Sequence, residues 1–140
     1  MKANAVCTGV LALAASFGAA AATPTETCID ALAKDPGLQV LADKVALARS
    51  GQAALVRVAD RAPTGPERAA LASWMEKRSQ CFDAGAGKRR ALSKPQEIAF
   101  LRSVFVFQQR LVADLQQGRL TYAEFNQQRA ELAQAAGTEI

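Results

Sequence analysis

Helix-start signatures recur along this chain and constrain its fold more than any other feature. Each has Ser or Thr followed three residues later by Glu or Gln, a capping box in which the two side chains satisfy backbone N–H groups of the first helical turn. Three of the four carry proline in that turn, where its missing N–H costs little. The signatures begin at Thr23, Thr64, Ser93 and Thr121. This repetition predicts an all-α protein.

Helix stops match these starts. Glycine, which readily adopts the left-handed conformation just past a helix, stands at Gly37, Gly85, Gly118 and Gly137. Clear helices are predicted over 24–34, 65–84, 94–117 and 121–136, with a further short helix over 53–60, an ambiguous helical or extended segment over 38–48, and a loop over 85–94. We therefore expect a compact bundle of four to five helices.

Hydrophobic spacing indicates which faces of these helices point inward. The 65–84 helix has its large apolar side chains on one face, which we expect to point inward. The 94–117 helix is apolar nearly all round, as is typical of the central helix of a bundle. Arg102 and Arg110 interrupt that helix too strongly for it to span a membrane. The inner face of the 65–84 helix consists of Leu71, Trp74, Met75, Arg78 and Phe82.

Residues 1–22 are predicted to be a cleavable signal peptide. Lys2 precedes an apolar run of small residues, and the alanines up to Ala22 supply the site that a signal peptidase accepts. The run is shorter than the roughly 20 apolar residues that span a bilayer, so we do not expect a retained anchor. Residues 23–140 then form a single helical domain, which we expect to be periplasmic or secreted.

Two cysteines, Cys28 and Cys81, remain after cleavage, in a compartment that favours disulfides. The chain has no histidine, and two thiolates fall short of the four ligands of a structural zinc site. It also has no C-x-x-C motif to serve redox chemistry. We therefore predict a structural Cys28–Cys81 disulfide.

A tight helical hairpin is predicted around Leu115-Gln116-Gln117-Gly118-Arg119-Leu120-Thr121-Tyr122-Ala123-Glu124-Phe125. This stretch resembles the short C-terminal helical hairpin domain of many bacterial proteins, over about residues 111–133. The resemblance implies a role in oligomerisation. Tyr122 and Ala123 depart from the polar pair usual in that family. The whole chain also resembles small exported proteobacterial helical proteins of unknown function, in its early cysteine, in the stretch from Trp74 to Phe82, and in its closing GRLTYAEFNQQR.

Two candidate surfaces follow from these patterns. The first is a protein-partner surface formed by residual apolar side chains of the last two helices. The second is an anion-binding loop, 88–94, for lipid head groups or acidic glycans; its alternative is a solvated loop that only aids solubility. The partner surface would comprise Phe100, Val106, Phe107, Tyr122 and Phe125, and the anion-binding residues would be Lys88, Arg89 and Arg90.

The leading functional hypothesis is a non-enzymatic exported protein that acts through protein–protein interaction or self-association, with a homodimer as one arrangement. The alternative is a binder of anionic envelope surfaces, including weak contact with an anionic membrane. The chain has no histidine, which excludes hydrolysis by a catalytic triad or a Cys–His pair. We therefore expect no enzyme activity, and we expect no cofactor or metal. Nucleic acid is not an expected partner, because no aromatic residue interleaves the basic cluster.

Overall fold

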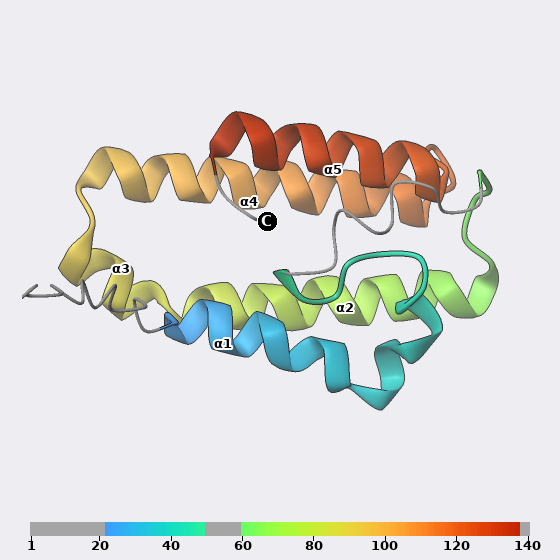
Figure 1. Ribbon diagram of the computed structural model, residues 1–140, viewed down its shortest axis with the longest axis horizontal. Coiled ribbons are helices and arrows are strands. Elements are labelled where there is room, and N and C mark those ends of the chain that lie inside the picture. The colour runs from blue at the N-terminus through green and yellow to red at the C-terminus, as the bar shows by residue number, and fades with distance from the viewer. Residues whose placement is uncertain (1–21, 50–59, 138–140) are drawn as a thin grey trace, which may run out of the picture.

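The protein is all-helical in the part that the computed structural model describes, residues 22–49 and 60–137, and no strand occurs there. The prediction of a compact helical bundle is confirmed (Figure 1). The elements are α1 (Pro24–Ala31), the 3₁₀ segments η1 (Leu32–Lys34) and η2 (Pro36–Leu41), α2 (Gly65–Ala84), α3 (Ala86–Leu92), α4 (Pro95–Gln116) and α5 (Tyr122–Ala136).

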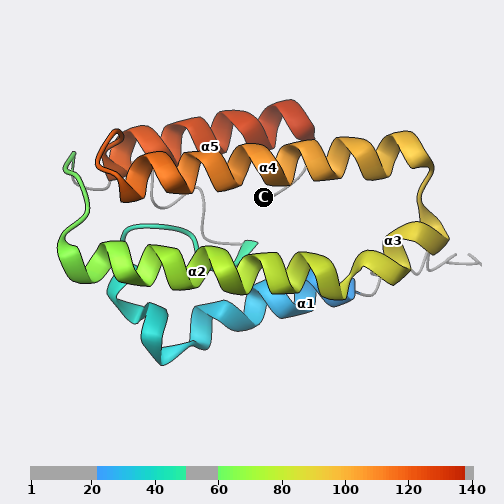
Figure 2. The same cartoon turned by 180° about the vertical axis from the view of Figure 1, so that it is seen from behind.

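The helices form two layers that meet along α2 and α4. One layer is the antiparallel hairpin of α4 and α5, and the other is α2 with α1 and η2 packed on its outer side (Figures 1 and 2). The short helix α3 joins the layers at one end of the molecule, and the turn around Gly118 closes the hairpin at the other end. The ends of the bundle therefore differ, because α4 continues beyond α5 toward α3.

Capping begins the helices largely where the sequence predicts. The amide of Thr23 donates to Glu26 Oε2 at 2.6 Å, that of Thr64 to Glu67 Oε2 at 2.8 Å, and that of Thr121 to Glu124 Oε2 at 2.8 Å. The fourth box, predicted at Ser93, is wrong by one residue.

In the fourth case Lys94 is the N-cap, and its amide donates to Glu97 Oε2 at 3.0 Å. Pro95 occupies the first helical position, where its fixed φ suits the helix, and the cap is the residue that precedes it. Lysine offers no side-chain acceptor, so only the carboxylate half of the box forms.

Two predicted segments differ from the structure, and a third lies almost wholly outside the described residues. The first helix ends at Ala31 and tightens into the 3₁₀ turn of η1 instead of continuing to residue 34. The ambiguous segment 38–48 is neither a regular helix nor extended: η2 ends at Leu41 and is followed by turns. The helix predicted over 53–60 lies outside the described residues except for Asp60.

The predicted loop 85–94 is largely helical, since α3 occupies Ala86–Leu92. The reason is the backbone of Gly85, whose φ of −84° and ψ of −2° stay near the helical region. The chain therefore resumes a helix after a one-residue break. Gly118 and Gly137, by contrast, adopt φ values of +73° and +63°, and they end α4 and α5 in the left-handed conformation expected of C-terminal glycines.

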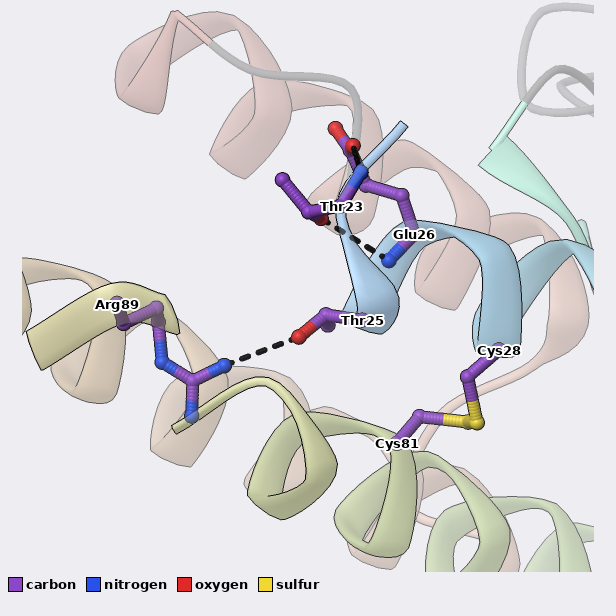
Figure 3. The surroundings of a disulfide bond; sticks show 6 residues. All are labelled: Thr23, Thr25, Glu26, Cys28, Cys81 and Arg89. Atoms are coloured by element: carbon purple, nitrogen blue, oxygen red, sulfur yellow. Dashed lines mark hydrogen bonds between the residues drawn. A yellow bond between two sulfur atoms is a disulfide. The ribbon is translucent and has the colours of Figure 1, made fainter. Parts of the chain in front are cut away.

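The core extends from the interface between the two layers to the contact of α2 with η2, and the predicted disulfide joins α1 to α2. Cys28 of α1 is bonded to Cys81 of α2, with 5.4 Å between their Cα atoms (Figure 3). Trp74 meets Phe125 edge-on, at 6.4 Å between ring centroids, and so joins α2 to α5. The largest fully buried side chains are Trp74, Tyr122, Phe125, Leu38, Leu41, Leu71, Leu115, Val45, Asn126 and Cys81.

Candidate functional site

Positive charge is concentrated at the α3 end of the molecule. Residues 86–110 contain six Lys and Arg residues and one Glu, whereas the other described residues contain nine basic and eleven acidic side chains. The single carboxylate of this segment, Glu97, accepts the capping hydrogen bond of α4. Lys88, Arg90, Lys94, Arg102 and Arg110 are all exposed. This end of the bundle is therefore a cationic surface on an otherwise mildly acidic molecule.

Large apolar side chains are exposed along the same two helices, α3 and α4. Leu92 at the end of α3 is 73% exposed, and Phe100, Val106 and Phe107 of α4 are 49%, 50% and 44% exposed. The outer face of α4 also carries a shallow groove, lined by Pro95, Ile98, Ala99, Arg102, Ser103, Val106, Phe107 and Arg110. We call the exposed residues Lys88, Arg90, Leu92, Lys94, Phe100, Arg102, Val106, Phe107 and Arg110 the basic–apolar surface.

The predicted partner surface is partly corrected by this arrangement. Phe100, Val106 and Phe107 are exposed as required, but Tyr122 and Phe125 are 0% and 1% exposed. Both belong to the core because α5 turns its aromatic face toward Trp74, and the Tyr122 amide donates to the Arg61 carbonyl at 3.0 Å. Neither residue is available to a partner of the folded chain.

The predicted anion-binding residues also divide into two groups. Lys88 and Arg90 point outward from α3, whereas Arg89 is only partly exposed and turns inward. The Arg89 guanidinium donates to Thr25 Oγ1 at 3.0 Å (Figure 3). The same group donates to the Phe82 carbonyl. It also lies 3.8 Å from the centroid of the Phe82 ring. Burial lowers the pKa of Arg89. Arg89 is therefore a structural contact that joins α3 to α1 and α2.

Aromatic stacking extends this contact to α4. The Phe82 ring stacks on Phe105 at 4.4 Å between centroids, with the planes 8° apart. Arg89, Phe82 and Phe105 thus tie α3, α2 and α4 together at the basic end of the bundle. The stack lies beside a pocket of about 340 Å³ that α1, α2, α3 and α4 enclose, with Phe82, Arg89 and Phe105 among its lining residues.

Charged and polar side chains occupy the interior next to this pocket. Arg78 and Arg129 are 4% and 2% exposed, and both guanidinium groups lie over the Trp74 ring, at 5.4 and 5.3 Å from its centroid. Arg78 Nη2 donates to Gln108 Oε1 at 2.8 Å, and Arg129 Nη1 donates to the Ala46 carbonyl at 2.8 Å. These contacts connect α2, α4 and α5 around the single tryptophan of the chain.

The electrostatic environment of the two arginines follows from their burial. Desolvation lowers the pKa of Arg78 to about 10, so its guanidinium stays charged at neutral pH. Desolvation, and secondarily the charge of Arg78, holds the pKa of Arg129 well below its ordinary value. Buried guanidinium groups are rare in cores unless acceptors surround them, because a guanidinium only donates hydrogen bonds.

Sequence analysis predicted the place of Arg78 but not its role. Its spacing from Trp74 puts it on the inner face of α2, as the helical periodicity predicts. The inward turn of Arg89 and the burial of Gln108 and Arg129 carry no such signal. Each depends on a neighbouring helix that is far away in sequence.

No family model, no curated protein and no solved structure matches this chain. Within residues 22–49 and 60–137, no three side chains of the metal-ligating kinds gather as candidate ligands. No helix in those same ranges has the length and apolar character needed to cross a bilayer.

Proposed function

We propose that this protein is a non-enzymatic exported protein that attaches to anionic lipid surfaces of the cell envelope through its basic–apolar surface. The observation that carries the proposal is that exposed charge and exposed apolar side chains occur together along α3 and α4. Residues 86–110 hold five exposed cations and four large exposed apolar side chains, and the rest of the described chain has more acidic than basic residues. This distribution would orient the molecule as it approaches an anionic surface.

The physical basis is additive attraction over a short range. Each Lys or Arg near an anionic bilayer contributes about 1 kcal/mol, and this contribution falls off within a Debye length of about 8 Å at physiological salt. Exposed Leu92 and Phe100 would add apolar contact at the acyl boundary, which amphipathic surfaces use to strengthen binding. Binding should therefore depend on both salt and apolar side chains.

Co-sedimentation with vesicles tests the proposal. We expect residues 23–140 to bind vesicles of phosphatidylcholine with phosphatidylglycerol at 50 mM NaCl, and to release from them at 500 mM NaCl. The double variant Lys88→Glu/Arg90→Glu should lose this binding. The matched control Lys34→Glu/Arg119→Glu changes the net charge by the same amount, but at positions outside the basic–apolar surface. This control should keep most of the vesicle binding. Equal binding to pure phosphatidylcholine vesicles would contradict the proposal.

Export is part of the same proposal and has its own test. The disulfide supports it, because such bonds persist mainly in oxidising compartments. We expect the protein recovered from an expressing bacterium to have the intact mass of residues 23–140 with both cysteines oxidised. A full-length mass with free thiols would contradict export.

A second candidate is self-association along the groove on the outer face of α4. The observation in its favour is the exposure of Val106 and Phe107 beside that groove. Arg102 and Arg110 line the same groove, so a second copy would bring like charges together, and this is why we rank it second. Light scattering after size exclusion distinguishes the two: a dimer at low and high salt that Phe107→Glu abolishes would support self-association.

A further inference from the structure

The pocket beside the Arg89–Phe82–Phe105 stack has the composition of a small-ligand site. Its volume of about 340 Å³ lies at the lower end of the range of about 300–1,000 Å³ typical of small-molecule sites. The walls are mostly apolar and come from four helices, so the pocket depends on the whole bundle. The apolar side chains are Ile29 of α1, Phe82 of α2, Leu92 of α3, and Leu101, Val104 and Phe105 of α4.

Buried hydrogen-bond donors lie at the floor of this pocket. Arg78 and Gln108 are each 4% exposed, and both line the pocket as well as a cavity of about 10 Å³ behind it. One bond joins them, from Arg78 Nη2 to Gln108 Oε1. Arg78 Nη1 and Gln108 Nε2 are left without a hydrogen-bond partner among the described residues. Buried polar groups are normally paired, so two adjacent unpaired donors indicate an acceptor that binds there.

The charge balance of the pocket favours an anionic acceptor. Arg49, Arg78, Lys88 and Arg89 line it, and Glu26 is the one carboxylate among its described lining residues. That carboxylate is engaged elsewhere, because it accepts from the Thr23 amide at 2.6 Å and pairs with Arg49 at 3.0 Å. A water molecule could satisfy the donors, but it would leave the charge of Arg78 without a counter-ion.

We propose that this pocket binds a small amphipathic anion, an aliphatic chain that ends in a carboxylate. The carboxylate accepts hydrogen bonds from Arg78 Nη1 and Gln108 Nε2 at the floor, and the chain lies between Phe82, Phe105 and the aliphatic walls. A volume near the lower limit of small-molecule sites suits a medium-length chain. Lys88 and Leu92 belong both to the lining of this pocket and to the basic–apolar surface, but the donors Arg78 and Gln108 do not, so ligand binding does not require attachment of that surface to a membrane.

Titration of the oxidised protein, residues 23–140, with decanoate below its micelle-forming concentration tests the proposal. Isothermal calorimetry should give saturable binding of one decanoate per chain. The fluorescence of Trp74 should change in parallel, because it is the only tryptophan and the Arg78 guanidinium lies 5.4 Å from its ring. Decanol, which has the chain without the charge, and acetate, which has the charge without the chain, should each bind at least tenfold more weakly.

Two variants separate the head-group contact from the chain contact. Arg78→Gln should weaken decanoate binding at least tenfold while decanol binding stays the same. Leu101→Trp fills the pocket and should abolish saturable binding. Ser103→Trp places the same side chain at an exposed position on the outer face of α4, so it should bind decanoate as the unmodified protein does. Circular dichroism would check that each variant is folded.

The proposal is overturned if decanoate shows no saturable binding, if decanol binds as tightly, or if Leu101→Trp binds decanoate normally. If Arg78→Gln does not fold, the decanol comparison and the Leu101→Trp variant still decide the matter. These titrations use no vesicle, and Leu101→Trp keeps the basic–apolar surface intact. A failure here is therefore distinguishable from a failure of the proposed membrane attachment.

Discussion

Gly85 should be the glycine of this bundle least tolerant of a side chain. A Cβ placed on Gly85 would lie 1.8 Å from Thr25 Oγ1, 3.1 Å from Thr25 Cβ and 2.8 Å from Arg89 Nη1. The Thr25 hydroxyl could rotate away, but its Cβ is fixed to the backbone of α1. Gly85→Ala must therefore displace α1, which the disulfide holds only three residues further on at Cys28.

The cost of Gly85→Ala can be worked out from three effects. Overpacking costs about 1–3 kcal/mol, and loss of the Arg89–Thr25 hydrogen bond, which has a charged donor, costs about 1.5–3 kcal/mol if it breaks fully. The lower chain entropy of alanine in the unfolded state offsets about 0.4–1 kcal/mol, since the backbone of Gly85 is in a region alanine can adopt. We expect a net destabilisation of about 2–5 kcal/mol, toward the upper value if the hydrogen bond breaks fully.

Urea unfolding followed by circular dichroism measures this difference, and Gly87→Ala is the matched control. Gly87 lies within α3 two residues later, and a Cβ there would meet nothing within 4 Å. Gly87→Ala should therefore stabilise the protein by about 0.5–1 kcal/mol. In a Thr25→Gly background, which lacks the Thr25 Cβ as well as the hydroxyl, most of the steric penalty of Gly85→Ala should disappear. A Gly85→Ala protein as stable as the unmodified one would refute the steric reasoning.

Three further perturbations test other contacts. Arg61 lowers the pKa of Glu67 to about 2 from 4.5, so the ionised carboxylate stabilises the fold above about pH 4.5, and this stabilisation is lost as the pH falls toward 2. The free energy of unfolding measured with urea should therefore decline over that window by about 2 kcal/mol, allowing for solvent around Arg61, and the decline should be smaller in Glu67→Gln. Reduction of Cys28–Cys81, which closes a loop across a separation of 53 residues, should cost about 4 kcal/mol; an unchanged thermal midpoint in dithiothreitol would contradict this. Gly118→Ala places a Cβ at a φ of +73° and should lower the free energy of unfolding by about 1–2 kcal/mol in urea. An unchanged stability would contradict this and would mean that the hairpin turn rearranges.

Helix positions were predictable from this sequence because their signals are local. A capping box and a C-terminal glycine act within four residues, so α2 begins and ends where Thr64, Glu67 and Gly85 predict. The prediction that Gly85 ends the helix failed, because its φ of −84° lets the chain resume a helix after one residue. The close approach of Thr25 to Gly85 comes from a helix about sixty residues earlier, so no local signal reports it.

The candidate sites were less predictable, because they depend on which helix covers which. The exposure of Phe100 and Phe107 was anticipated, but the burial of Tyr122 and Phe125 shows that apolar spacing cannot tell a core face from a free one. Arg89 and Arg90 are adjacent in sequence, yet one is drawn inward by Thr25 and Phe82 and the other is exposed. The pocket above Arg78 requires four helices at once.

Because α4 is longer than α5, its two halves should differ in how readily they open. All of its buried residues, Gln108, Leu111, Val112 and Leu115, fall in the half that α5 covers, and none lies between Pro95 and Phe107. Amide hydrogen exchange tracks local opening, which is easiest where few apolar contacts hold a segment. Exchange along this one helix should therefore quicken from Leu115 toward Ala99. The half that carries the exposed aromatic side chains could then rearrange around a binding partner while the hairpin end keeps the bundle folded.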